Sequence, residues 1–179
     1  MCIMKPETCH FHLGTCREPE WAQSHCFIDH TIYLANSSGV KVGITRSNQR
    51  QTRWMDQGAI SAIPLATVTD RFKSGQAEVF FKQFVSDKTN WRKMLKNEVE
   101  DIDLEEIREE MQEEWPQEIA ATTDTSTSQL NISYPVLEYP TKITSLNFDK
   151  NPLVEGTLLG IKGQYLSLIH IWRCRRRIE

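Results

Sequence analysis

The sequence predicts an α+β fold in which a small antiparallel sheet has flanking helices. Residues 30–46 predict a two-stranded hairpin, because aliphatic residues alternate on both sides of a turn signal from Asn36 to Gly39. Residues 60–69 predict a third strand, and a stripe of phenylalanines predicts a helix at 75–86. With 179 residues, of which 39% are hydrophobic, the chain can bury a core around such a sheet.

Changes in composition divide the chain into six parts. They are a Cys-rich segment (1–29), an α/β domain (30–97), an acidic helix (98–119), a polar linker (120–133), an incomplete β-rich unit (134–165) and a basic tail (166–179). Lys and Arg exceed Asp and Glu by 5 over residues 1–97, whereas the acids exceed the bases by 11 over residues 98–165. A polyanionic partner is therefore expected to avoid the acidic helix.

No membrane-spanning or secretory segment is expected. No run approaches roughly 18 apolar residues, and the first residues lack the apolar core of a signal peptide. The expected location is the cytoplasm, where cysteines are thiols or metal ligands rather than disulfides.

Three further helices are expected, at 49–57, 91–95 and 101–115. The last is strongly acidic and ends at Pro116. One apolar face predicts that this helix packs on the domain while its acidic side stays solvated. The residues of that face are Leu104, Ile107, Met111 and Trp115.

The loop of the hairpin decides its register. A three-residue loop at 37–39 places all the aliphatic side chains on one face, whereas a two-residue turn would divide them between both faces. It also puts Gly39 at the left-handed position that such loops require, and Tyr33 opposite Gly43. The aliphatic residues are Ile32, Leu34, Val40, Val42 and Ile44.

The other face of the hairpin offers a candidate phosphate site. Because Gly43 has no side chain, open space is expected in front of the Tyr33 ring. The alternative is an ordinary solvent face on which Tyr33 packs against the backbone. Hydrogen-bond donors suited to an anion surround the ring. They are Lys41, Thr45, Arg46, Arg50 and Arg53.

These residues resemble the GIY-YIG nuclease pattern over about residues 30–87, with Ile32-Tyr33, Lys41 to Thr45, Arg53 and Glu78 as the matches. The resemblance implies that Tyr33 and Arg53 act at the scissile phosphate and that Glu78 binds a catalytic Mg²⁺. The chain also departs from the pattern. Thr31 replaces the first glycine, no His or Tyr follows Arg53, and Lys41, a poor general base at neutral pH, replaces the second tyrosine.

Glu78 has a second interpretation. Lys82 follows it by four residues, so a surface ion pair along a helix also explains the glutamate.

The cysteines predict a zinc site. Residues 1–29 have little apolar periodicity, so a segment of this kind needs a metal to fold; the alternative is buried free thiols. The expected ligands are Cys2, Cys9, Cys16 and Cys26, with His10, His12 and His25 in reserve. Their spacing differs from the short Cys-x-x-Cys knuckle of well-marked zinc sites.

Residues 1–165 also resemble a bacterial family that joins a zinc-finger segment to a GIY-YIG-like domain (DUF2797). The stretches that carry this resemblance are Cys9–Pro19, Tyr33–Gly39 and Pro140–Asn147. It implies further cysteines upstream, with Cys2 as the second of a pair. Residues 166–179 instead resemble a translated sequencing adapter, so the native C-terminus is expected to be missing; a basic nucleic-acid-binding tail is the alternative.

The expected function is therefore action on nucleic acid, DNA or RNA, by a GIY-YIG-like domain with metal-dependent endonuclease activity. The alternative is a non-catalytic, zinc-containing module on the same fold that binds nucleic acid or another partner. Lys41 in the tyrosine position favours the module, and Glu78 favours the enzyme.

Overall fold

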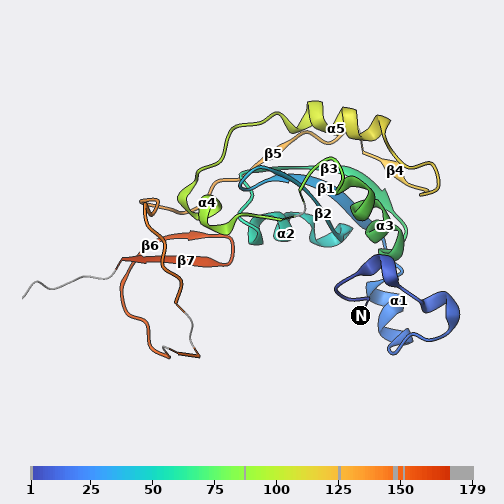
Figure 1. Cartoon of the computed structure of the whole chain (residues 1–179), viewed down its shortest axis with the longest axis horizontal. Coiled ribbons are helices and arrows are strands. Elements are labelled where there is room, and N and C mark those ends of the chain that lie inside the picture. The colour runs from blue at the N-terminus through green and yellow to red at the C-terminus, as the bar shows by residue number, and fades with distance from the viewer. Residues whose placement is uncertain (1, 87, 125, 147–148, 151, 170–179) are drawn as a thin grey trace, which may run out of the picture.

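A computed structural model describes residues 2–86, 88–124, 126–146, 149–150 and 152–169. The fold is α+β, as predicted: a small antiparallel sheet has helices on both faces (Figure 1). The α-helices are α1 (Pro19–His25), α2 (Arg50–Asp56), α3 (Arg71–Phe81), α4 (Trp91–Lys96) and α5 (Leu104–Glu113). The strands are β1 (His30–Asn36), β2 (Val40–Arg46), β3 (Ser61–Val68), β4 (Thr122–Thr123), β5 (Leu130–Asn131), β6 (Thr157–Lys162) and β7 (Tyr165–Ile169).

The central sheet has β1 between β2 and β3, and all three strands are antiparallel. The predicted hairpin register is confirmed, since Leu34 pairs with Val42 and Tyr33 pairs with Gly43. Gly39 has a φ of 125°, which supplies the positive φ that the loop requires. Asn36 supports the same loop, because its Oδ1 accepts a hydrogen bond from the Gly39 N–H at 3.3 Å.

The two faces of β1 belong to different cores. The aliphatic face packs beneath α3 and α5, where Phe81, Leu104 and Met111 are buried against Ile32 and Leu34. The predicted apolar face of the acidic helix is thereby confirmed, with Ile107 and Trp115 at the edge of the same core. The second face is covered by α2, whose Trp54 is buried against Tyr33. Helix α3 ends at Phe81, so Phe84 falls beyond it and is 53% exposed.

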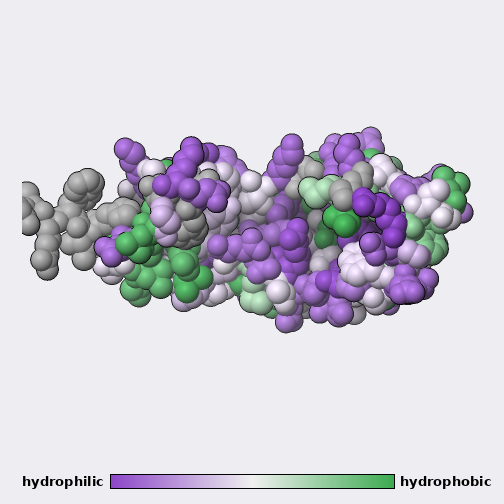
Figure 2. Space-filling view, turned by 90° about the horizontal axis from the view of Figure 1, so that it is seen from below, coloured by the Kyte–Doolittle hydropathy of each residue, from purple (hydrophilic) through white to green (hydrophobic). Residues whose placement is uncertain are grey.

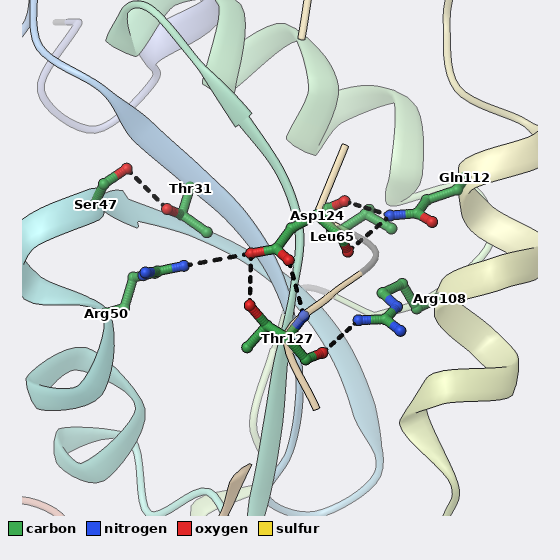
Figure 3. Close-up of polar contacts among 8 residues, drawn as sticks. All are labelled: Thr31, Ser47, Arg50, Leu65, Arg108, Gln112, Asp124 and Thr127. Carbon is green, nitrogen blue, oxygen red and sulfur yellow. Dashed lines mark hydrogen bonds and ion pairs between the residues drawn. The ribbon is translucent and has the colours of Figure 1, made fainter. Parts of the chain in front are cut away.

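The stretch expected to be a linker, residues 120–133, runs along the free edge of β3. Its two short strands pair with β3 at Ala66–Thr67 and at Ser61–Ala62. Helix α5 links the stretch to β3, because its Gln112 donates hydrogen bonds to the carbonyls of Leu65 in β3 and of Asp124 in the stretch (Figure 3). These contacts involve backbone carbonyls, which explains why the polar composition alone gave no sign of them.

The Cys-rich segment lies against the first turns of α3 (Figure 1). Pro6 is buried there, in the short 3-10 helix Pro6–Thr8. Gly75 permits the approach, because a Cβ at this position would lie 2.5 Å from the Glu7 nitrogen. Arg71 adds two links: its N–H donates to the Cys26 carbonyl, and its guanidinium donates to the Ile3 carbonyl.

The C-terminal unit is a hairpin of β6 and β7 with one further segment beside it. Residues 135–137 run along β6, where the Leu137 N–H donates to the Leu159 carbonyl. The turn of the hairpin rests on the end of α2, and Gly163 approaches the Asp56 carbonyl there. Residues 166–169, the start of the segment expected to be adapter-encoded, belong to β7, and residues 170–179 lie outside the described residues. The origin of this segment stays a prediction.

Candidate functional site

Tyr33 lies at the middle of β1, on the face that α2 covers. Its ring is fully buried and packs edge-on against Trp54, with 5.8 Å between the ring centroids. Its hydroxyl donates a hydrogen bond to Oε1 of Gln57, the residue that follows α2, at 3.1 Å. The phenol is therefore a hydrogen-bonded core residue and not a group on a solvent face.

Gly43 explains how the ring fits. A Cβ on Gly43 would lie 2.6 Å from both Cζ and Oη of Tyr33, so the ring lies directly over the glycine backbone. The expected open space in front of the ring is therefore wrong, because the tyrosine itself fills it. Absence of a side chain in a strand permits close approach by a neighbour as readily as it leaves room for a ligand.

The electrostatic surroundings of Tyr33 keep its phenol protonated. Burial raises the pKa of Tyr33 above its ordinary value, because the charged phenolate would be poorly solvated. The positive charge of Arg53 and the hydrogen bond to Gln57 lower this pKa, and the carboxylate of Glu78 raises it. Arg53 and Glu78 thus both lie near enough for their charges to act on the phenol.

Lys41 is buried, although it was expected to line the phosphate site from a solvent face. Only 6% of its surface is exposed, and its Nζ donates a hydrogen bond to Oγ1 of Thr89 at 2.6 Å. The chain after α3 causes this burial: β2 pairs with Ser86 at Lys41, and the Val42 N–H donates to the Ser86 carbonyl. The ammonium group therefore serves an internal contact.

Three arginines lie in and before α2. Arg53 is exposed, and Arg46 donates a hydrogen bond to Gln49 at 2.7 Å. Arg50 forms an ion pair with Asp124, with 3.7 Å between Nη1 and Oδ2 (Figure 3). Thr45, the remaining expected donor, is half-buried near the end of β2. This side of the molecule is hydrophilic across its middle (Figure 2).

Glu78 satisfies parts of both interpretations. It forms an ion pair with Lys82 at 3.5 Å, as the surface interpretation expected. Its charge also acts on Tyr33, as proximity to the candidate site would require. Helix α3 places Glu78 one residue after the buried Ala77, at the flank of the packed face.

Two residues of this neighbourhood escaped the sequence analysis. Gln57 follows Arg53 by four residues, and that helical spacing is the signal that could have placed both beside Tyr33. Asp124 lies in the stretch expected to be a linker, and no local pattern indicates its pairing with Arg50. Thr127 holds the Asp124 carboxylate through its N–H at 3.1 Å and its hydroxyl at 2.9 Å.

The four cysteines of the N-terminal segment gather in one region but do not form a closed metal site. Burial raises the pKa of the Cys26 thiol, and charge on Cys9, Cys2 or Cys16 would raise it further, whereas Arg71 lowers it. Each of the three thiols is therefore near Cys26. Among the residues that the structure describes, however, no three Cys, His, Asp or Glu side chains are arranged so that they could hold a metal ion. Cysteine sulfurs are ligands that zinc prefers, and the four cysteines lie in one region. Their side chains would have to move closer together to bind one ion.

Within the described ranges, no helix is long and apolar enough to cross a membrane. No curated protein and no solved structure matches the chain. One family model does match, over residues 1–171: DUF2797, described as a protein of unknown function. Since the match spans more than half of the chain, the chain belongs to the DUF2797 family.

Proposed function

We propose that this protein is a nucleic-acid-binding module with a GIY-YIG-like hairpin, and that it binds the phosphate backbone through the arginines of the α2 side. The observation that carries the proposal is the contrast across α2. Arg53 of α2 is exposed, whereas Tyr33 is fully buried beneath the helix. Guanidinium groups are well suited to phosphate, because their donors match two oxygens at once.

Binding is favoured over cleavage because the catalytic positions are enclosed. A group that activates water or contacts the scissile phosphate must reach the reacting atoms. Tyr33 is fully buried and bonded to Gln57, and Lys41 stands buried where the nuclease pattern has its second tyrosine. Neither group can reach a phosphate outside the protein without rearrangement of α2, Ser86 or Thr89.

Binding is tested by fluorescence anisotropy with labelled DNA and RNA, single-stranded and duplex. Arg53→Ala and Arg46→Ala should each weaken binding to every sequence alike and lower the salt dependence by about one ion for each phosphate that the arginine neutralises. Arg17→Ala is the matched control, since it removes one exposed arginine from the N-terminal segment. Equal effects of all three variants, or no binding at all, would refute the proposal.

Metal-dependent endonuclease activity is the second candidate, favoured by the proximity of Arg53 and Glu78 to Tyr33, whose pKa each charge shifts. In this alternative Glu78 would hold Mg²⁺, which would stabilise charge on the phosphate. The test is Mg²⁺-dependent cleavage of branched, single-stranded and duplex substrates. Cleavage that Glu78→Ala reduces by orders of magnitude, with binding retained, would establish the enzyme. Cleavage that survives Glu78→Ala would point to a contaminant.

We also propose that Cys2, Cys9, Cys16 and Cys26 hold one structural zinc ion, which would cross-link the N-terminal segment. Support comes from the influence of the three other thiols on Cys26. Elemental analysis after dialysis should give about one zinc per chain. Metal-free protein in which all five cysteines of the chain, Cys174 included, titrate as free thiols would refute the site.

A further inference from the structure

A second group of cations and aromatic rings surrounds α4, outside the candidate site. The rings of Trp91 in α4 and Tyr165 in β7 are parallel within 6°, with 6.1 Å between their centroids. The guanidinium carbon of Arg92 lies 4.2 Å from the centre of the Trp91 ring. We call these three residues, Trp91, Arg92 and Tyr165, the α4 platform.

The α4 platform is partly exposed, and several cations lie near it in the sequence. Tyr165 is 40% exposed, Arg92 is exposed and Trp91 is half-buried. Lys93 and Lys88 are exposed. Helix α4 contains Arg92, Lys93 and Lys96 and no acidic residue, and Lys96 forms an ion pair at 3.5 Å with Glu98, just beyond the helix.

The α4 platform is joined to the end of α2. Gly58, just beyond α2, approaches α4 so closely that a Cβ there would lie 2.4 Å from the Met94 sulfur. Figure 1 shows α4 and the β6–β7 hairpin at the same end of the sheet. A strand that follows the α2 arginines toward this end of the helix therefore comes to the platform.

We infer that the α4 platform is a base-stacking subsite and that the nucleic acid this module binds is single-stranded. The inference rests on the proposed function, because it extends the same binding surface. Aromatic faces bind any base by stacking, and nearby Lys and Arg contact the backbone. A duplex keeps its bases stacked on one another, so only a single strand can offer a free base to Tyr165 or Trp91.

A purely structural role would be to hold the hairpin on α4. The two roles differ in what they predict for ligands. Packing alone affects stability and leaves the preference between single strands and duplexes unchanged, whereas a stacking subsite sets that preference.

The test compares labelled single-stranded oligonucleotides with the matched duplex by anisotropy at fixed salt. Tyr165→Ala and Trp91→Ala should each weaken single-strand binding by about 5- to 100-fold, the range seen for loss of one stacked base. Duplex binding should change by less than about twofold, because the paired bases of a duplex do not stack on these rings. Trp21→Ala is the matched control: this tryptophan is 42% exposed and stacks on His25, but it lies in the N-terminal segment.

Photo-crosslinking provides a measurement on the intact protein, in case Trp91→Ala fails to fold. A single strand containing 5-iodouracil should crosslink to Trp91 or Tyr165, identified by mass spectrometry of the peptides. Crosslinks elsewhere, or equal losses for Trp91→Ala and Trp21→Ala while Arg53→Ala still weakens binding, would overturn the platform and leave the proposed function intact. Absence of binding to every nucleic acid would overturn the proposed function itself.

Discussion

The two faces of β1 are buried equally well but in different ways. Beneath α3 and α5, the middle of β1 is apolar, as Ile32 and Leu34 pack against Phe81, and His30 and Asn36, which are buried and polar, lie at the two ends of the strand. Beneath α2, the buried residues include Thr31 and Tyr33, and their hydroxyls are bonded to Ser47 and Gln57. Burying a hydroxyl is costly unless a partner is supplied, so this face depends on a few specific hydrogen bonds.

The difference assigns distinct tasks to the faces. The α3 side stabilises the fold through apolar area, and conservative substitutions there should leave any binding surface unaffected. The α2 side joins the core to the exposed Arg53 through Tyr33 and Gln57. Substitutions on this side should therefore change ligand binding at a smaller cost in stability.

The largest expected effect is on the aliphatic face. Phe81→Ala should lower the free energy of unfolding by about 3–5 kcal/mol, because it removes a fully buried ring and leaves a cavity. Urea denaturation measures this decrease. Phe84→Ala is the control, since Phe84 is 53% exposed and should cost far less. A similar decrease for both variants would contradict the assignment of Phe81 to the core.

The next effect concerns Lys162, which secures the C-terminal unit near the end of α2. Its Nζ donates to Asn97 at 2.7 Å, and it lies over the rings of Tyr134 and Tyr139. Tyr134 in turn donates its hydroxyl to the carbonyls of Met55 and Ala59. Burial lowers the pKa of Lys162 from its ordinary 10.5 to about 8.

The sign of the pH dependence follows from this shift. Between about pH 8 and pH 10.5 the unfolded chain holds a proton that the folded chain has released, so the free energy of unfolding should rise with pH. The contribution is at most about 1.4 kcal/mol per pH unit. Lys162→Met should remove this rise. Cysteines and tyrosines also titrate in this pH range, but they affect both proteins alike, so the difference between the two slopes of unfolding free energy against pH reports Lys162 alone. Identical slopes would show that the ammonium is not buried.

Gly43 tests the contact on the α2 side. Gly43→Ala should cost about 1–3 kcal/mol, because the new methyl group would collide with the Tyr33 ring. In a Tyr33→Leu background the cost should largely disappear. Gly39→Ala serves as the control: Gly39 has a φ of 125° and open space around it, so its cost comes from the backbone and should persist in that background. Additive effects of Gly43→Ala and Tyr33→Leu would argue against the close approach.

The hairpin was predictable from sequence because its signals are local. Alternation with period two and Gly39 in the loop fix which residues pair, and the structure has that register. The cover over the second face was not predictable in the same way. Helix α2 has a single buried residue, Trp54, so its sequence has no apolar stripe that would indicate a packed helix.

The motif resemblance selected Tyr33, Arg53 and Glu78, and the structure brings Arg53 and Glu78 near enough to Tyr33 for their charges to shift its pKa. That the three form a functional site stays a prediction. The burial of Lys41 depends on Thr89, far along the chain, and the pairing of Arg50 depends on Asp124. Contacts between residues so far apart in the chain produce no periodic pattern in the sequence, so the spacing of residues could not predict them.

The smallest expected effect concerns the ion pair between Asp124 and Arg50. Asp124 holds Arg50 in a partly exposed ion pair, and such pairs are worth about 0.2–1 kcal/mol. Asp124→Asn keeps an acceptor for Thr127 but frees the guanidinium of Arg50, so nucleic-acid affinity should rise by up to about fivefold. Glu109→Gln, an exposed position on α5, removes the same charge elsewhere and should change affinity less. Adding Arg50→Ala should abolish the gain from Asp124→Asn, because the effect acts through that arginine. If the gain survives without Arg50, it reflects only the removal of a negative charge, and Arg50 does not contact the ligand.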